Sequence, residues 1–299
     1  MTQLSDEFFS KLIKGAEFLH TRPENILVVL TGESAGSMDP AATKWARPSR
    51  MPTSWADANQ LLASENKPGA LGLNTMQPGA ASTIGMTPQQ WYHLPDMSAA
   101  ENLDYSIKFF EAMRKTRMPQ NPGYTNALEL YLANAAPAML GSRLQSGTVV
   151  YNSTLTKSNP ALDIDKDGVI TVKDMAAVVE AIATGKIPRA AMPPGSQNTN
   201  NTWYMSAVPY IKQFYSFLER NGMEVPGSYS AVSYQGEEPT QLYDPGSVDE
   251  QIDQINKSHP DSKYYKGMAE KSDSNNVGGK LFIGSLLGFI GYNLYKKHL

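Results

Sequence analysis

Residues 26–34 have the sequence Ile-Leu-Val-Val-Leu-Thr-Gly-Glu-Ser, an apolar run that ends in a carboxylate. Thr21 precedes this run as a capping residue and Pro23 as an early helical proline, so the stretch predicts a buried helix that ends at Glu33. A carboxyl group at the end of an apolar helix loses water, and this desolvation raises its pKa because it disfavours the charged form. Glu33 is therefore a candidate general acid near neutral pH. The alternative is a helix end that places a surface glutamate near solvent.

The composition excludes several classes of function. The chain has 299 residues, 41% of them hydrophobic, which is enough for one large domain or two small ones with a core. The net charge is −3 and the charges are scattered, so no direct nucleic-acid recognition is expected. Without cysteine the chain has no disulfide, thiolate catalyst or cysteine-bound zinc. The four histidines are far apart in sequence, which argues against a histidine zinc site, and the first residues do not resemble a secretory signal peptide.

The first 140 residues are predicted to be mainly helical, because no segment there alternates polar and apolar residues over a sustained length. Capping patterns and apolar periodicity predict helices over 6–19, 55–62, after Thr87, after the Ser98–Glu101 capping box and over 126–132. Residues 36–68 otherwise predict a long irregular segment. Its two tryptophans, Trp45 and Trp55, are expected either to stack on a sugar or to pack in the core.

Four motifs occur in a characteristic order: residues 33–36 (Glu-Ser-Ala-Gly) with 39–42 (Asp-Pro-Ala-Ala), residues 69–73 (Gly-Ala-Leu-Gly-Leu) with 78–85, residues 97–105, and residues 130–133 (Leu-Tyr-Leu-Ala). This order resembles the lytic transglycosylase family, whose domains are similar to goose-type lysozyme. The resemblance covers roughly residues 20–185, and the motifs near 97–105 and 130–133 look like the variants carried by phages.

The resemblance implies a mainly α, lysozyme-like catalytic domain that cleaves the β-1,4 bond between N-acetylmuramic acid and N-acetylglucosamine in peptidoglycan. Glu33 takes the place of the family glutamate, which acts first as an acid and then as a base toward the muramyl 6-hydroxyl. The product is a 1,6-anhydro sugar, so no second carboxylate is required, unlike the pair in most glycosidases. Ser34 and Tyr131 match family residues that support this glutamate.

Three features depart from the family pattern. Thr75 stands where the family has a glutamine, so a contact to the substrate or to the glutamate is changed. Gln77 lies two residues further on and is a candidate replacement. Leu132 stands where most members have an asparagine, and the segment between Glu33 and Gly72 is longer than usual. Ser34, Thr75, Gln77 and Tyr131 are the expected substrate-binding residues.

Residues 163–174 fit the calcium loop of an EF-hand. Loop position 6 is Gly168, position 8 is the apolar Ile170, and a helix is expected from Val172 to Ala183. The predicted ligands occupy loop positions 1, 3, 5, 7, 9 and 12, namely Asp163, Asp165, Asp167, the Val169 carbonyl, Thr171 and Asp174. Asp174 replaces the usual bidentate glutamate, and this shorter side chain weakens calcium binding or admits magnesium. A single loop predicts one structural Ca²⁺; the alternative is an acidic turn without a metal.

The C-terminal third divides by composition. Residues 188–201 predict a linker, 202–222 a docking helix with its helical part from Trp203 to Arg220, and 223–278 a polar extended segment. Residues 279–299 predict a hydrophobic terminal helix. Its apolar part, 281–295, spans only about 22 Å, less than the roughly 30 Å hydrocarbon core of a bilayer. A short membrane anchor, a membrane-perturbing tail and a helix buried in an oligomer or virion remain as alternatives.

The sequence thus predicts a mainly α chain with a largely extended C-terminal region and a hydrophobic terminal helix, and the resemblance implies a lysozyme-like domain over 1–187. The expected function is a virion-associated peptidoglycan lytic transglycosylase that opens the host cell wall, in the periplasm, during phage DNA entry. Its expected partners are glycan strands, other virion proteins through 202–299, and a membrane through 281–295. The alternatives are a catalytically inactive tail or capsid protein and a bacterial membrane-anchored wall-remodelling enzyme.

Overall fold

The computed structural model describes residues 2–141, 145–157, 159–160, 162–185 and 206–227, and this part of the chain is mainly helical, as expected. The linker over 188–201, nearly all of the polar segment over 223–278 and the hydrophobic helix over 279–299 lie outside the described residues. Within the described residues, no helix combines the length and apolar character needed to cross a membrane.

The elements are mostly short helices, with two short strands near the end of the domain. In order they are α1 (Asp6–Phe18), α2 (Pro23–Glu33), the 3-10 helix η1 (Pro40–Ala46), α3 (Trp55–Glu65), α4 (Pro78–Thr83), α5 (Pro88–Tyr92), η2 (Leu94–Asp96), α6 (Ala99–Arg117), α7 (Ala127–Ala135), η3 (Pro137–Met139), β1 (Val149–Tyr151), α8 (Ser153–Lys157), β2 (Ile170–Thr171), α9 (Val172–Thr184) and α10 (Val208–Arg220).

Most of these helices begin where the capping patterns predict. The Ser5 hydroxyl accepts a hydrogen bond from the Phe8 amide, and complete capping boxes start α5 at Thr87 and α6 at Ser98. The expected cap of α2 is wrong, because Arg22 is the N-cap and gives no side-chain cap. Thr21 lies one residue too early, and its hydroxyl instead accepts a hydrogen bond from the Asn25 side-chain amide at 3.1 Å.

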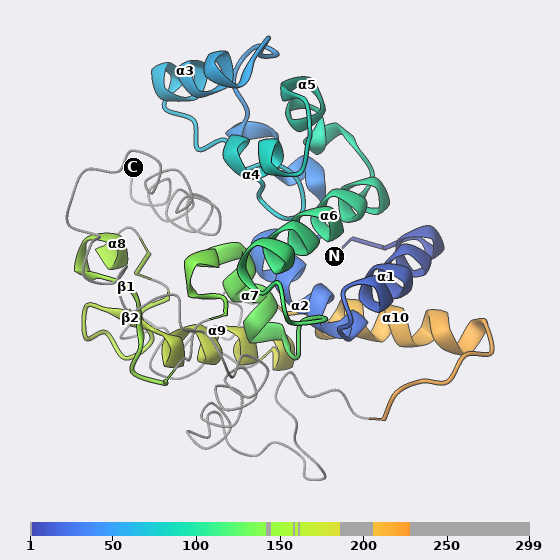
Figure 1. The fold of residues 1–299 in the computed structure, drawn as a ribbon. Coiled ribbons are helices and arrows are strands. Elements are labelled where there is room, and N and C mark those ends of the chain that lie inside the picture. The colour runs from blue at the N-terminus through green and yellow to red at the C-terminus, as the bar shows by residue number, and fades with distance from the viewer. Residues whose placement is uncertain (1, 142–144, 158, 161, 186–205, 228–299) are drawn as a thin grey trace, which may run out of the picture.

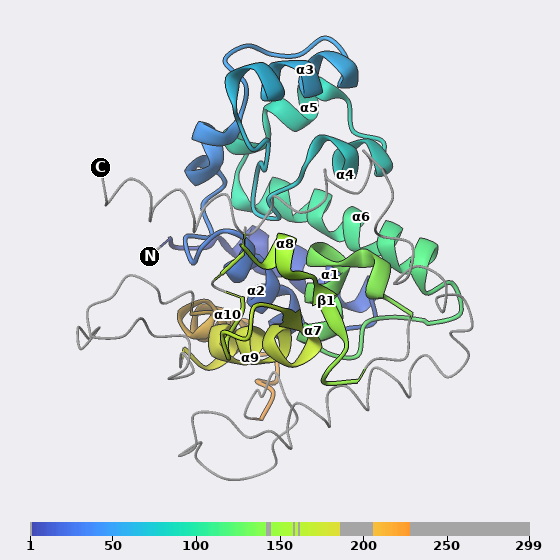
Figure 2. The ribbon, with the colours of Figure 1, turned by 90° about the vertical axis from the view of Figure 1, so that its left-hand side faces the viewer.

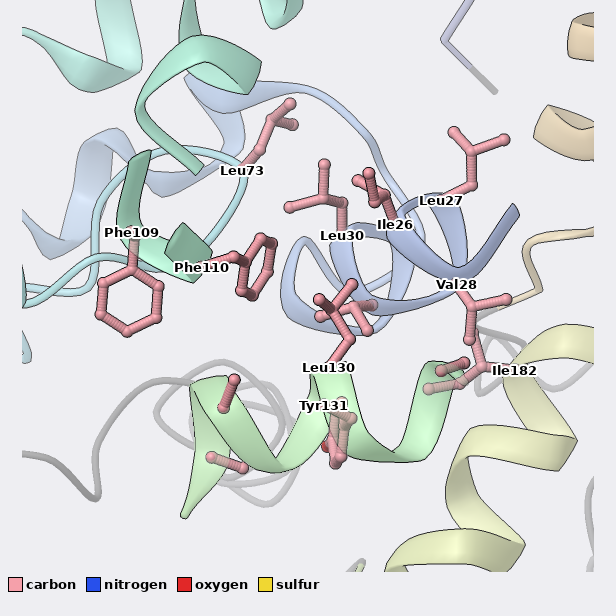
Figure 3. Packing of buried hydrophobic residues seen from close by; sticks show 14 of the residues in the cluster. Ile26, Leu27, Val28, Leu30, Leu73, Phe109, Phe110, Leu130, Tyr131 and Ile182 are labelled. Carbon is pink, nitrogen blue, oxygen red and sulfur yellow. The ribbon is translucent and has the colours of Figure 1, made fainter. Parts of the chain in front are cut away.

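Helix α2 forms the centre of the molecule. Every residue from Glu24 to Glu33 is buried, because α1, α7, α9 and α10 all pack against this helix. In both ribbon views, α3 and α5 lie at one end of the molecule and α9 and α10 at the other (Figures 1 and 2). Leu30 of α2, Phe110 of α6, Leu130 of α7 and Ile182 of α9 belong to one hydrophobic cluster (Figure 3). A helix that is apolar on all sides requires such a position.

Helix α10 packs on the helical domain rather than projecting from it. The Phe9 ring of α1 lies 5.8 Å from the Phe214 ring and 5.5 Å from the Phe217 ring, and the Tyr215 hydroxyl donates to Glu24 of α2 at 2.9 Å. The expected start at Trp203 is wrong, since Ser206 and Ala207 precede the helix and Pro209 lies in its first turn, where proline favours a helix start.

The two tryptophans of the 36–68 segment pack against the core. Both are half-buried, and the Trp55 ring meets the buried Trp91 ring edge-on at 6.1 Å. Of the two expectations for these tryptophans, packing in the core accounts for their positions.

Candidate functional site

Glu33 is the last residue of α2 and is only 1% exposed, which confirms the prediction of a buried helix that ends in a carboxylate. Burial raises the pKa of Glu33 to about 7, although a hydrogen bond from Thr75 acts in the opposite direction. Asn134 also lies near enough to lower this pKa, yet its Nδ2 makes no hydrogen bond of ordinary geometry. Glu33 therefore exchanges its proton near neutral pH, as a general acid must.

Thr75 reaches Glu33 from a tight turn between α3 and α4. The backbone groups of Leu71 and Met76 pair across this turn, with N–O distances of 3.2 and 2.8 Å. The Thr75 hydroxyl donates a hydrogen bond to Oε2 of Glu33. Thr75 has a φ of +44°, a left-handed conformation that is strained for a β-branched residue. Thr75, one of the predicted substrate-binding residues, thus contacts the carboxylate itself.

Helix α7 supplies the opposite side of the site. Tyr131 and Asn134 are three residues apart and so lie on one face of the helix. The Tyr131 hydroxyl, the Asn134 Nδ2 and Oε1 of Glu33 are all buried without a hydrogen-bond partner among the described residues. Burial, and then the charge of Glu33, raise the pKa of Tyr131 well above its usual value. Buried polar atoms are nearly always hydrogen-bonded, so unpartnered ones in a cluster are typical of a binding or catalytic site.

Tyr151 of β1 is a further neighbour of Glu33. Its hydroxyl donates to the Ala135 carbonyl at the end of α7, and burial and then the Glu33 charge raise its pKa. None of the described carboxylates is among the groups that shift the pKa of Glu33. The site therefore contains one acid among neutral polar groups.

The structure brings Glu33, Thr75 and Tyr131 together, but not the other two predicted substrate-binding residues. Ser34 caps the C-terminus of α2, and its hydroxyl accepts a hydrogen bond from the Met38 amide at 3.0 Å. Gln77 is the N-cap residue of α4 and is largely buried. The described contacts include no hydrogen bond from either residue to Glu33.

Sequence reasoning missed Asn134 and Tyr151. Asn134 has a local signal, because it lies three residues after Tyr131 on a helix whose face was already assigned to the site. Tyr151 has none, since only the packing of β1 beside α7 brings it near Glu33.

A second candidate site lies in the predicted cation loop. Carboxylate oxygens of Asp163, Asp165 and Asp174 all lie within 4.8 Å of one another. One oxygen of Asp163, Oδ2, accepts a hydrogen bond from the Gly168 amide at 3.0 Å, while Oδ1 is buried and has no partner among the described residues. Gly168 has a φ of +90°, so this turn requires glycine. The loop therefore brings three carboxylates close together beside a turn that requires glycine.

Of the other three predicted ligands, Asp167 is not part of this group, whereas the Val169 carbonyl and the Thr171 hydroxyl are not acidic groups. Asp167 accepts a hydrogen bond from the Val169 amide at 2.8 Å, and Thr171 is the N-cap of α9. The Thr171 hydroxyl donates to Asp174 at 2.6 Å, so Asp174 both caps the helix and faces the loop. The strand β2 at the end of the loop pairs antiparallel with β1, opposite Tyr151.

Comparisons with known proteins give no relative. No family model, no curated protein and no solved structure matches the chain. The function is therefore inferred from the residues and their geometry.

Proposed function

We propose that this protein is a peptidoglycan lytic transglycosylase with a lysozyme-like helical domain. The observation that carries the proposal is the enclosed carboxyl of Glu33, with a pKa of about 7 and no second described carboxylate acting on it. Its position at the end of a buried helix, together with the motif order of the sequence, supports the same activity.

The chemistry needs one group that gives and then takes a proton. Protonated Glu33 donates its proton to the glycosidic oxygen as the bond from that oxygen to C1 of N-acetylmuramic acid breaks. The resulting carboxylate then accepts the proton of the muramyl 6-hydroxyl as its oxygen bonds to C1. The proton lost in the first step is recovered in the second, and the product is a 1,6-anhydro sugar. A pKa near 7 suits both steps, because neither protonation state is strongly disfavoured at neutral pH.

The unpartnered groups on α7 are suited to hold the substrate. The Asn134 amide and the Tyr131 hydroxyl can donate hydrogen bonds to the sugar hydroxyl and acetamido oxygens beside Oε1 of Glu33. A substrate that makes these bonds removes the cost of leaving the groups buried and unpaired.

The setting that we propose is a phage virion, with the C-terminal region attaching the domain to other virion proteins or to a membrane. This part of the proposal follows from the phage-like variants of the motifs. Helix α10 packs on α1 through Phe9 and on α2 through Glu24. This packing would anchor the start of the C-terminal region on the helical domain.

We further propose that the loop over 163–174 binds one Ca²⁺ as a structural ion. Asp163, Asp165 and Asp174 supply the clustered carboxylates, and the buried, unpartnered Oδ1 of Asp163 supports a cation there because an isolated buried carboxylate oxygen is costly. Asp167, the Val169 carbonyl and Thr171 complete the predicted ligand set. A bound ion would tie the loop to the first turn of α9, which Asp174 caps.

One observation favours a catalytically inactive virion protein. Glu33 is 1% exposed, so a glycan strand reaches Oε1 only after the surrounding side chains move. The replacement of the family glutamine by Thr75 is consistent with this second candidate.

Release of soluble glycan from purified peptidoglycan separates the two candidates. We expect the wild type to release fragments and Glu33→Gln to lose activity by about 100-fold or more, the usual contribution of a general acid. Glu24→Gln is the matched control, because Glu24 is also a buried carboxylate of α2 but lies at the opposite end of the helix. It should retain activity. Folded wild type that releases nothing would contradict the enzyme and favour the structural protein.

A further inference from the structure

The turn that carries Thr75 is held from three sides. The Gly72 amide donates to the Thr43 hydroxyl of η1 at 2.9 Å, and the Leu73 amide donates to the Asn102 side chain of α6 at 3.2 Å. The Trp91 indole of α5 donates to the Met76 carbonyl at 2.8 Å. These anchors fix both ends of the turn, so the strained conformation of Thr75 is imposed by its surroundings.

The strain has a definite result at Glu33. In its left-handed conformation Thr75 directs its hydroxyl at Oε2 of Glu33, where it donates a hydrogen bond. Oε1 accepts no hydrogen bond of ordinary geometry from the described residues, although the Asn134 side chain lies close enough to Glu33 to lower its pKa. The two oxygens of the carboxyl therefore have different environments: Oε2 accepts a hydrogen bond from Thr75, and Oε1 has no partner of ordinary geometry among the described residues.

We propose that Thr75 is the positioning residue of Glu33: it holds Oε2 in place so that Oε1 is the atom that exchanges a proton with the substrate. The choice of Oε1 rests on the proposed function, whereas the hold on Oε2 does not. Threonine thus acts in this chain at the position where the resembling family has glutamine, and it does so through the acid rather than through the substrate.

The hydrogen bond also sets the proton affinity of Glu33. A hydroxyl that donates to a carboxylate favours the charged form, and Thr75 is the stronger of the two groups that oppose burial, Asn134 being the other. The described titratable groups that interact with Glu33 are Tyr131 of α7 and Tyr151 of β1. Both have raised pKa values and are neutral at pH 7, so they add no charge. The hydrogen bond from Thr75 is thus the main interaction that opposes the rise in the Glu33 pKa caused by burial.

The test measures the Glu33 titration directly, in the full chain, without relying on catalysis. Carboxyl carbons of ¹³C-labelled glutamate are followed by NMR from pH 5 to 9, and the signal missing in Glu33→Gln is assigned to Glu33. Thr75→Val removes the hydroxyl and keeps the branched shape, and we expect it to raise the Glu33 midpoint by about one pH unit, the loss of one hydrogen bond to a charged group. Thr75→Ser retains the donor and should keep the wild-type midpoint.

Thr75→Gly covers the case in which the valine variant does not fold, because glycine adopts the left-handed region without strain. It should raise the midpoint as valine does. A wild-type midpoint in the valine or glycine variant, or an equal shift in the serine variant, would overturn the proposal. A purely structural role for Thr75 would lower stability but leave the midpoint unchanged.

Activity gives an independent readout. In the active enzyme, the fall of kcat/KM at high pH should move upward with the NMR midpoint in Thr75→Val and stay in place in Thr75→Ser. The wild type could cleave no peptidoglycan while Thr75→Val still raises the Glu33 midpoint. That result would support the hold of Thr75 on Glu33 and refute the transglycosylase. The two proposals therefore fail separately.

Discussion

Replacement of Glu33 by glutamine should stabilise the protein at high pH, and by an amount that depends on pH. Burial raises the folded-state pKa of Glu33 from its ordinary 4.5 to about 7. Below pH 4.5 both folded and unfolded chains carry the proton, so the folded state suffers no penalty. As the pH rises toward 7 the unfolded chain loses the proton first, and the folded state therefore loses stability. Above about pH 7 both states are ionised and the loss is complete.

The size of the effect follows from the pKa difference. About 2.5 pH units at about 1.4 kcal/mol per unit give a loss of about 3 to 4 kcal/mol in the wild type. Glutamine does not ionise, so this loss is absent in Glu33→Gln. The glutamine side-chain oxygen can still accept the hydrogen bond from Thr75. Because glutamine has no titratable group, any other effect of the substitution on stability should not change with pH. We expect the variant to gain about 3 to 4 kcal/mol over the wild type between pH 4.5 and 8.

Urea unfolding of both proteins at a series of pH values measures this difference. Glu101→Gln is a useful control, because hydrogen bonds from the Ser98 backbone and side chain lower the pKa of the exposed Glu101. The ionised Glu101 carboxylate stabilises the folded wild type at pH values above the ordinary pKa of glutamate. Glu101→Gln should therefore become less stable relative to the wild type as the pH rises. A difference between Glu33→Gln and wild type that does not change with pH would refute the raised pKa, and with it the physical basis of the acid.

Three further predictions test other parts of the structure. Tyr215→Phe should cost about 1–3 kcal/mol in urea unfolding, because it removes the hydroxyl that donates to the buried Glu24, and an unchanged stability would mean that α10 does not dock there. Gly123→Ala should destabilise by more than about 2 kcal/mol, since its Cβ would lie 2.4 Å from the Leu19 carbonyl oxygen, whereas Gly147→Ala, with no atom within 4 Å, should be neutral in the same assay. Ca²⁺ at about 100 times its Kd should stabilise the wild type by about 2.7 kcal/mol, seen as a higher Tm that a chelator reverses. Asp163→Asn should show no such response, and equal melting curves of the wild type with Ca²⁺ and with chelator would exclude the site.

Local patterns predict those parts of the fold that depend on neighbouring residues. The run of apolar residues before Glu33 predicts a buried helix, and the capping boxes at Thr87 and Ser98 place the starts of α5 and α6, because both features act within one or two helical turns. The same holds for the turn at Gly168 and the helix that starts at Val172 after the cation loop. Such patterns do not distinguish well between adjacent cap positions. Thr21 is the predicted N-cap of α2, whereas Arg22 occupies that position.

The contacts of the candidate active site depend instead on tertiary packing. Thr75 is 42 residues from Glu33, and its hydroxyl reaches the carboxylate only because Thr43, Asn102 and Trp91 fix the turn that holds it. Its left-handed backbone is not a conformation that a threonine in a sequence predicts. Tyr151 comes from β1, which pairs with β2, and its hydroxyl reaches the Ala135 carbonyl at the end of α7 only through tertiary packing.

Mass spectrometry of muropeptides tests the central proposal most directly. Wild type, Glu33→Gln and Glu24→Gln are each incubated with peptidoglycan in the presence of Ca²⁺, and the chemical form of the new glycan ends is determined. We expect 1,6-anhydro-muropeptides from the wild type and from Glu24→Gln, and none from Glu33→Gln. New reducing ends in place of anhydro ends would keep Glu33 as the acid but make the enzyme a hydrolase. Intact glycan strands with folded wild-type protein would contradict the catalytic role of Glu33.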